Sequence, residues 1–276
     1  MTEAPRGTEA PNETGTAEAT DGATGAAANQ YEAIGDKYRS FKDASTRESP
    51  EQAHVAELLG DVSGLRVLDL GCGHGHYTRY VKGLGAERVT GVDLSPEMVR
   101  LAREALPEDA TGIDFRVGDA AGLGAIGEFD VVMAVWLFPY TESVAALKGM
   151  MATVAGNLVP GGRLVAVTAH HSFDPERQDW EPHGLRVLSH TALPRRHRMT
   201  AALLAPRGEI VVESSLWEED VYAEAAREAG LSVPRWSVPD IPESSLRERG
   251  PEHWDVFRSN PFMAGLTARK EPGAGA

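Results

Sequence analysis

Three glycines stand at alternate positions in the segment VLDLGCGHGHYTRY, namely Gly71, Gly73 and Gly75. A glycine-rich turn after an apolar strand lets a ligand approach the backbone closely, because glycine has no Cβ atom. Asp69 precedes this turn, and a carboxylate there would repel a pyrophosphate and attract a ligand with a positively charged amino group. The dinucleotide-binding pattern would also need a glycine where the chain has His76. The turn therefore predicts a site for a ligand other than a dinucleotide.

Two further carboxylates end segments of the same apolar kind. Asp93, in GVDLSPEM, lies roughly 20 positions after the first glycine, where a carboxylate can accept hydrogen bonds from both hydroxyls of a ribose. Asp119, in RVGDA, could accept from the amino group of an adenine while the backbone N–H of Ala120 donates. Ligands of open α/β folds bind at the carboxyl ends of the strands, so the three acids are expected at one site. Each acid alone could equally be a turn or helix-capping residue.

The elements that must position these residues alternate between strand and helix patterns. Several of the apolar segments lack alternation, which is typical of strands in a parallel sheet that helices cover on both faces. Short β-like runs between 184 and 217 predict an inserted antiparallel hairpin or cap. We predict strands at 65–70, 88–94, 113–119, 129–136, 162–169, 231–238 and 262–270, and helices at 50–59, 77–84, 96–106, 141–158 and 218–229.

Composition divides the chain into one domain and two ends. Residues 1–28 contain no Val, Ile, Leu or aromatic residue, so we predict a disordered acidic tail. We expect one domain at 29–270 and a flexible C-terminus at 271–276. Within the domain, 29–60 would form a helical lid and 172–217 a substrate-side insertion. In the lid, Tyr31, Ile34, Tyr38 and Phe41 recur at helical spacing.

Charge and cysteine content exclude several classes of function. A formal net charge of −14 disfavours binding to nucleic acid or to an anionic membrane surface. The longest apolar run, 131–138, is too short to span a bilayer, and the opening residues do not resemble a signal peptide. The single cysteine, Cys72, allows no intrachain disulfide. We therefore expect a cytoplasmic protein.

Together, these motifs resemble those of the class I S-adenosylmethionine-dependent methyltransferases, over roughly residues 31–168. VLDLGCGHG is similar to the family's first motif, which places Asp69 near the methionine amino group and the glycine loop beneath the sulfonium arm. GVDLSPEM resembles the ribose motif, in which Leu94 and Met98 flank the adenine, and RVGDA resembles the adenine motif. The cofactor-binding residues that we predict are Tyr31, Tyr38, Asp69, Gly71, Cys72, Gly73, Asp93, Leu94, Met98, Asp119, Ala120 and Val135.

The resemblance implies an α/β fold with a Rossmann-like sheet of seven strands, the last of them antiparallel, and helices on both faces. The N-terminal helix and the segment EHWDVFRSNPF resemble the toxoflavin-type N-methyltransferases, which act on small molecules of secondary metabolism. The N-terminal helix also resembles that of natural-product C-methyltransferases and methyltransferase-like cyclases, where it can be exchanged between subunits. A homo-oligomer formed through this helix follows as an expectation.

Methyl transfer from a sulfonium mainly requires that donor and acceptor are held in line and that water is excluded. Tyr38 or Tyr31 would close over the cofactor, although both could instead pack the lid helix on the core. Tyr140, which follows the fourth predicted strand, would face the reactive end of the cofactor. His170 and His171 end the fifth strand and could accept a proton from the acceptor, or could face solvent.

Three other groups of residues have a simpler interpretation than a role in binding or catalysis. The run of Arg and His at 195–198 could grip an acidic substrate, although such runs are more often solvated turns. His74 and His76 have no partners at metal-ligand spacing, so no metal is expected. Cys72 would fill a tight turn in the glycine loop rather than act as a nucleophile.

The sequence thus predicts N- or O-methylation of a small-molecule acceptor with S-adenosylmethionine as cofactor. The alternatives are C-methylation of an isoprenoid or aromatic carbon, with or without cyclisation, and a methyltransferase fold with non-methylating chemistry. C-methylation would be favoured if Trp136, Phe138, Tyr140 and Trp217 lined one pocket. A nicotinamide-dependent oxidoreductase and a non-enzymatic binding module fit the motifs less well.

Overall fold

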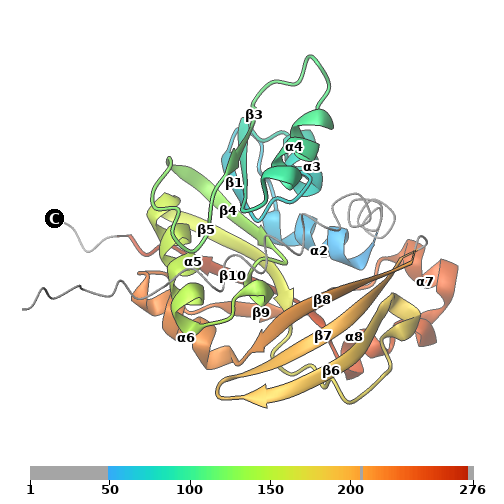
Figure 1. The fold of residues 1–276 in the computed structure, drawn as a ribbon. Helices are drawn as coiled ribbons and strands as arrows, with labels where there is room; N and C mark the ends of the chain where they lie inside the picture. Colours follow the sequence, from blue (N-terminus) through green and yellow to red (C-terminus); the bar gives the residue numbers. More distant parts are fainter. Residues whose placement is uncertain (1–48, 206–207, 273–276) are drawn as a thin grey trace, which may run out of the picture.

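The computed structural model describes residues 49–205 and 208–272 (Figure 1). A sheet of seven strands forms its centre, in the order β3-β2-β1-β4-β5-β10-β9. Strands β1 to β5 are parallel to one another, whereas β10 runs antiparallel to both β5 and β9. The strands are β1 (Arg66–Leu70), β2 (Arg88–Asp93), β3 (Ile113–Val117), β4 (Phe129–Val135), β5 (Leu158–Ala169), β9 (Arg235–Ser237) and β10 (Met263–Arg269). This order and the antiparallel last strand confirm the predicted fold class.

Helices cover both faces of this sheet because its strands are apolar on both sides. Val67 of β1 and Val131 of β4 pack with α2 and α3, whereas Leu68 and Val132, one residue further along, pack with α5 and α6. The helices are α2 (Pro50–Leu59), α3 (His76–Gly83), α4 (Pro96–Glu104), α5 (Val144–Asn157) and α6 (Glu219–Glu228). Successive residues of these strands are buried on opposite faces of the sheet. Both sets are therefore apolar, which explains why the segments lack polar alternation in the sequence.

Short local signals set where several elements begin. The hydroxyl of Ser95 accepts a hydrogen bond from the backbone N–H of Met98, and Pro96 follows it, so α4 begins directly after β2. The predicted helix at 141–158 starts later, because η1 (Phe138–Tyr140) comes first and Ser143 caps α5. The predicted strand at 231–238 is reduced to β9, and Leu231 contributes only an isolated bridge to Lys270.

The insertion between β5 and α6 forms a second sheet of three antiparallel strands. These are β6 (Leu185–Leu193), β7 (Arg196–Ala205) and β8 (Gly208–Trp217), in that order across the sheet. Figure 1 shows this sheet beside the central one, with α7 and α8 near it. Met199, Ala201 and Val212 lie on its inner face and join the core of the central sheet. The insertion is therefore a full three-stranded cap with an apolar inner face.

A helical segment that the sequence analysis did not predict lies between β9 and β10. It consists of α7 (Glu243–Arg249), η3 (Pro251–Trp254) and α8 (Val256–Ser259), and η2 (Glu181–His183) lies in the loop after β5. These pieces are too short to show helical periodicity in the sequence. None of the helices in the described part of the chain has the length and apolar character needed to cross a membrane.

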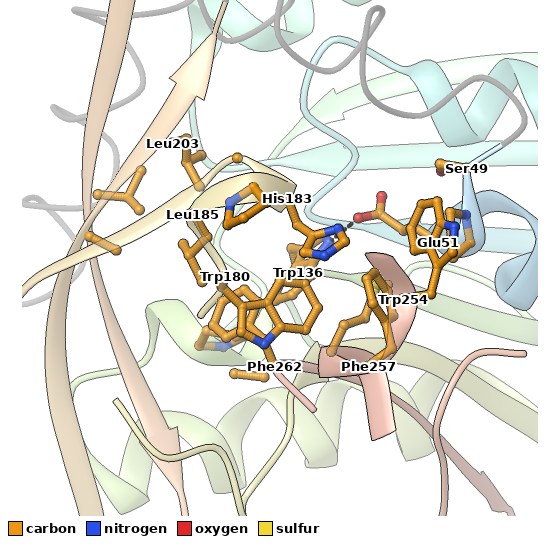
Figure 2. Close-up of a pocket in the computed structure, with 18 of the residues that line it drawn as sticks. Ser49, Glu51, Trp136, Trp180, His183, Leu185, Leu203, Trp254, Phe257 and Phe262 are labelled. Carbon is orange, nitrogen blue, oxygen red and sulfur yellow. Dashed lines mark hydrogen bonds between the residues drawn. The ribbon is translucent and has the colours of Figure 1, made fainter. Parts of the chain in front are cut away.

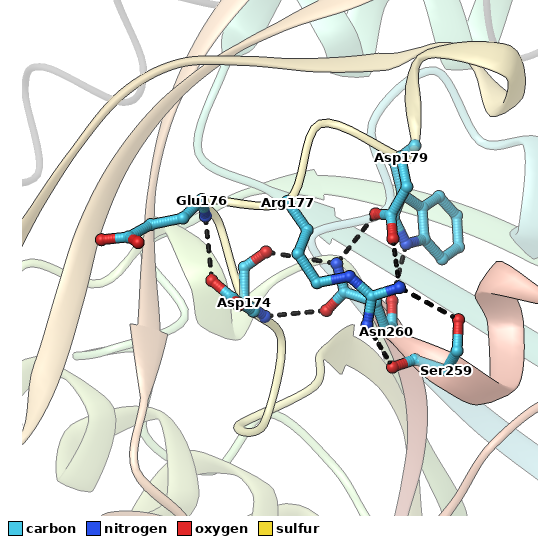
Figure 3. A network of polar contacts seen from close by, with 7 residues as sticks. Asp174, Glu176, Arg177, Asp179, Ser259 and Asn260 are labelled. Atoms are coloured by element: carbon cyan, nitrogen blue, oxygen red, sulfur yellow. Dashed lines mark hydrogen bonds and ion pairs between the residues drawn. The ribbon is translucent and has the colours of Figure 1, made fainter.

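Asn260 fastens this segment to the loop after β5 (Figure 3). Its side-chain oxygen accepts from the backbone N–H of Asp174 at 2.8 Å, and its amide nitrogen donates to Asp179 at 2.9 Å. Its backbone oxygen accepts from the indole N–H of Trp180 at 2.6 Å. Arg177 adds a hydrogen bond to the backbone oxygen of Ser259 at 2.7 Å. Asn260 is buried, so these bonds satisfy polar groups that water does not reach.

Candidate active site

The glycine loop between β1 and α3 turns as the sequence predicts. Gly71 and Gly73 have φ of +72° and +53°, a region that residues with a Cβ atom rarely adopt. The backbone N–H groups of Gly71 and Cys72 donate to the backbone oxygen of Val92 at 2.8 and 3.0 Å, which fixes the loop against β2. A Cβ atom built on Gly73 would meet nothing within 4 Å. The loop therefore leaves open space above Gly73 that a ligand can fill.

Asp93 links this loop to the start of α4. Its carboxylate accepts from the backbone N–H of Gly73 at 2.7 Å and from that of Ser95 at 2.9 Å. Its own backbone oxygen accepts from Gly118, at the end of β3. Burial raises the pKa of Asp93, and these backbone donors oppose that effect by stabilising the charged form. A carboxylate held in this way is positioned before any ligand arrives.

These residues line a cavity of about 130 Å³ at the carboxyl ends of β1, β2, β3 and β4. Its other walls come from η1, α4 and α5. The predicted residues that it brings together are Gly71, Gly73, Asp93, Leu94, Met98, Asp119, Ala120, Val135 and Tyr140. Apolar walls from Leu94 and Met98 with acids at two strand ends suit a flat base joined to a polar sugar. The residues present therefore fit a nucleoside.

Asp69 and Cys72 are absent from the described lining of this cavity. Asp69 is 1% exposed and accepts a hydrogen bond from the hydroxyl of Thr78, on α3, at 2.6 Å. Burial raises its pKa to about 7, and the nearby charge of Asp93 adds to the effect. The thiol of Cys72 is also buried, and burial raises its pKa well above the usual range. The hydrogen bond of Asp69 runs to α3, and its assignment to the methionine amino group, like that of Cys72 to the cofactor, stays a prediction.

A second, larger cavity of about 430 Å³ lies between the central sheet, the cap and the C-terminal helical segment (Figure 2). Indole and phenyl rings make up much of its wall, and the inner face of β6–β8 supplies aliphatic side chains. The aromatic and imidazole residues that line it are Trp136, Tyr140, Trp180, His183, His253, Trp254, Phe257 and Phe262. The cavity therefore suits a flat, largely apolar molecule.

Trp136 stands at the boundary between the two cavities and lines both, as does Tyr140. Its φ of +59° is unusual for a bulky residue and costs about 1–3 kcal/mol, a strain that often marks functional sites. Its indole N–H donates to Glu51 of α2 at 2.7 Å, and Glu51 also accepts from the hydroxyl of Tyr77 at 2.8 Å. Phe262 stacks on the indole at 5.3 Å. These contacts hold the ring in place.

His183 is a polar group in this aromatic wall that sequence reasoning missed. Its Nε2 lies 2.9 Å from the backbone oxygen of His253. Because a carbonyl only accepts, Nε2 carries the hydrogen and Nδ1 keeps a lone pair. Burial, and then His253, lower the pKa of His183 to about 4, so the ring is neutral at neutral pH. It can therefore accept a hydrogen bond from a ligand.

His170 and His171 end β5 as predicted, yet neither is among the described residues that line the two cavities. The two rings stack at 4.4 Å, and that of His171 packs edge-on against Trp236 at 5.2 Å. His170 bonds Ser172 at 2.7 Å, and His171 lies 3.6 Å from Glu219. Their assignment as proton acceptors stays a prediction. Tyr31 and Tyr38, the predicted lid residues, lie outside the described residues.

Residues 67–162 match the family model described as a methyltransferase domain. These residues form a methyltransferase domain. A solved S-adenosylmethionine-dependent methyltransferase from Mesorhizobium loti superposes with a TM-score of 0.59 and 25% sequence identity, over 80% of this chain and 98% of that chain. The seven-stranded methyltransferase fold therefore extends beyond the matched residues, to β10.

Curated relatives match this chain over part of their length. The ubiquinone biosynthesis O-methyltransferase of Xanthomonas oryzae pv. oryzae is 35% identical over 114 residues, 41% of this chain and 46% of that protein. The magnesium-protoporphyrin O-methyltransferase of Rhodobacter capsulatus is 38% identical over 90 residues, 32% of this chain and 39% of that protein. The chain thus matches about half or less of the length of these relatives.

Proposed function

We propose that the chain is an S-adenosylmethionine-dependent methyltransferase that methylates an oxygen or nitrogen atom of a small aromatic acceptor. The observation that carries this proposal is the meeting of two cavities at Trp136 and Tyr140. One cavity has the loop and acids that fit a nucleoside, and the other has flat aromatic walls. An enzyme that joins two substrates in line needs this arrangement. The relatives that match the domain include O-methyltransferases.

The cofactor would lie with its ribose at Asp93, its adenine between Leu94 and Met98, and its methionine part over Gly73. Bound there, S-adenosylmethionine supplies a methyl group activated by its positively charged sulfur. The rings of Trp136 and Tyr140 would then separate the reacting centre from bulk water. Aromatic faces stabilise nearby positive charge, so these rings also favour the sulfonium end of the ligand at this boundary.

The acceptor would enter the larger cavity and stack against its rings. The lone pair on Nδ1 of His183 would accept a hydrogen bond from the acceptor's O–H or N–H group and help to orient it. An amine can attack without prior loss of its proton, whereas a phenol transfers its proton during the reaction. Both acceptor types are compatible with a neutral imidazole in the wall.

Carbon methylation is less well supported. That alternative depends on Trp136, Phe138, Tyr140 and Trp217 lining one pocket, which would shelter a carbocation. Phe138 is fully buried against Tyr222, and Trp217 is buried beneath Arg196, so neither is among the described residues of the larger cavity. The natural-product class of the acceptor is proposed on the resemblance of residues 252–262, which supply Trp254, Phe257 and Phe262 to the wall.

A cavity-filling substitution tests the proposal. Leu203→Trp, on the inner face of β7, would occupy the larger cavity and leave the smaller one unchanged. With S-adenosylmethionine and a panel of phenols and aromatic amines, we expect wild type to release S-adenosylhomocysteine with some acceptors. Leu203→Trp should lose this turnover at least 10-fold, with unchanged calorimetric affinity for S-adenosylhomocysteine.

The matched control is Leu188→Trp on the neighbouring strand β6, where the side chain is exposed. It should keep both turnover and affinity. Failure of wild type to bind S-adenosylhomocysteine would refute the cofactor assignment. Full turnover in Leu203→Trp would refute the assignment of the acceptor to the larger cavity.

A further inference from the structure

A third cavity, of about 300 Å³, lies against the cap on the side opposite its apolar inner face. Arg196 and Arg198 of β7 line it together with Val211 and Glu213 of β8. Side chains alternate between the faces of a strand, so these two arginines project away from the face that carries Met199 and Ala201. The run of basic residues at 195–198 is thus divided, with two of its arginines facing one cavity.

Hydrogen bonds and an aromatic ring hold the side chain of Arg196 in position. Its guanidinium donates to the hydroxyl of Ser215 at 2.7 Å and lies 5.0 Å from the ring centre of Trp217. Ser215 in turn donates to the backbone oxygen of Thr141 at 2.8 Å, and the indole N–H of Trp217 donates to the hydroxyl of the same threonine at 2.8 Å. The guanidinium is therefore held in one orientation, with N–H groups left over for a ligand.

No described carboxylate forms an ion pair with Arg196 or Arg198. Their neighbour Arg195 differs, since it pairs with Asp220 at 3.1 Å and Glu224 at 2.8 Å. Burial and the charge of Arg198 lower the pKa of Arg196, whereas the charge of Glu142 opposes this effect. Two guanidinium groups that share a cavity and have no ion-pair partner among the described carboxylates can each bind an oxygen of a ligand anion.

This cavity adjoins the proposed active site and shares wall residues with both of its cavities. Tyr140 lines all three cavities, Thr141 and Glu142 are shared with the nucleoside cavity, and Pro139 and Ser214 are shared with the aromatic cavity. A molecule that is bound beside Tyr140 can therefore extend toward Arg196. Glu142 and Glu213 also line the third cavity, and their charges would repel a ligand with several negative groups.

We propose that Arg196 and Arg198 form a subsite for a single oxyanion, a carboxylate or phosphonate, carried by the methyl acceptor. This deepens the proposed function and rests on it, since it makes the substrate a small aromatic acid. The planar guanidinium of Arg196 would bind two oxygens of the anion together, and Arg198 would add charge at the open side.

Benzoate and neutral benzamide are planar probes of nearly the same shape that test this subsite, and phenylphosphonate offers a tetrahedral oxyanion. The full chain, saturated with S-adenosylhomocysteine, is titrated with each probe in a calorimeter at constant ionic strength. We expect benzoate or phenylphosphonate to bind at least 10-fold more tightly than benzamide. The relative affinity of the two anions reports which oxyanion the subsite prefers.

Arg196→Met and Arg198→Met should each reduce the preference for the anion at least fivefold. Arg196→Lys, which keeps the charge and the stem, should recover only part of it, because an ammonium cannot bind two oxygens in one plane. The control Arg116→Met removes an exposed arginine on β3, an edge strand of the central sheet, and should leave the preference for the anion unchanged. Arg198 is exposed, so its variant keeps the test valid if Arg196→Met fails to fold.

Equal affinity for benzoate and benzamide, binding of none of the probes, or an anion preference that survives both Met variants would overturn the subsite. The heat of binding of S-adenosylhomocysteine separates this result from failure of the proposed function. If that ligand binds normally while the anion preference is absent, the subsite alone is wrong. If it does not bind to wild type, the proposed function is wrong.

Discussion

At the scale of single residues, Asp93 connects three parts of the nucleoside cavity. It accepts from the glycine loop and from the start of α4, and its backbone accepts from the end of β3. A ribose at this point would add two further donors to a carboxylate that is already in position. Because the protein does not reorganise to form these hydrogen bonds, their free energy contributes directly to the affinity for the ligand.

Asp93→Asn should weaken the binding of S-adenosylhomocysteine. An amide offers one acceptor oxygen where the carboxylate offers two, and hydrogen bonds to a charged group contribute about 1.5–3 kcal/mol. We expect the dissociation constant from calorimetry to rise roughly 10- to 100-fold. Glu97→Gln, which loses a carboxylate on the adjacent helix α4, should leave affinity unchanged. An unchanged affinity for Asp93→Asn would remove this residue from the cofactor site.

Asp69 makes the stability of the protein depend on pH. Its pKa is about 7 in the folded protein, against an ordinary value of 3.8, because its carboxyl is buried. The folded state therefore holds a proton that the unfolded state has released between these two values. Stability contributed by this group is lost as the pH rises from about 4 to above 7, by about 4 kcal/mol in all.

Asp69→Asn removes this titration and keeps the shape of the side chain. The free energy of unfolding of the variant minus that of wild type should increase steadily between pH 4 and pH 8, as measured by urea denaturation. The exposed Asp109→Asn should give a difference that does not change over the same range. A pH-independent difference for Asp69→Asn would show that its carboxyl is not protonated in the folded protein.

At the scale of elements, the aromatic cavity depends on segments that are far apart in the sequence. The loop after β5 supplies Trp180, and the segment from η3 to β10 supplies Trp254 and Phe262. Asn260 joins the two through three side-chain hydrogen bonds (Figure 3). The nucleoside cavity uses neither segment. A substitution in the walls of the acceptor cavity should therefore leave the binding of the cofactor unchanged.

Asn260→Ala should uncouple the two segments. It leaves the backbone N–H and oxygen of Asp174 without their partners in the Asn260 side chain, so we expect a loss of about 1–3 kcal/mol in the free energy of unfolding. The KM for a turned-over acceptor should rise severalfold while the affinity for S-adenosylhomocysteine stays the same. Ser259→Ala loses only a long, exposed hydrogen bond to Arg177 and should resemble wild type. A loss of cofactor affinity with an unchanged KM would contradict this division.

At the scale of the whole molecule, the central sheet could be predicted because residues close together in the sequence specify each of its strands and turns. Apolar runs, the glycine turn after β1 and the acids at strand ends each lie within a few residues of the structure that they specify. The positions of Asp93, Leu94 and Met98 in one cavity follow from this register. Alternate apolar residues at 199, 201 and 203 carried a signal for the inner face of the cap that sequence reasoning did not use.

The aromatic wall and its histidine could not be predicted in the same way. His183 gains its place through η2 and a bond to His253, 70 residues later, and no local pattern encodes that contact. His170 and His171 were placed correctly at the end of β5, but their side chains pack with Trp236 of β9. The end of a strand is set locally, whereas the direction of its last side chains depends on the neighbouring element.

The most direct test of the account is a crystal structure of the full chain with S-adenosylhomocysteine. We predict density for the ribose hydroxyls at the carboxylate of Asp93, for the adenine between Leu94 and Met98, and for the sulfur at the boundary formed by Trp136 and Tyr140. Density for the ligand at another place, or clear density for the cavity without ligand under saturating conditions, would contradict the account.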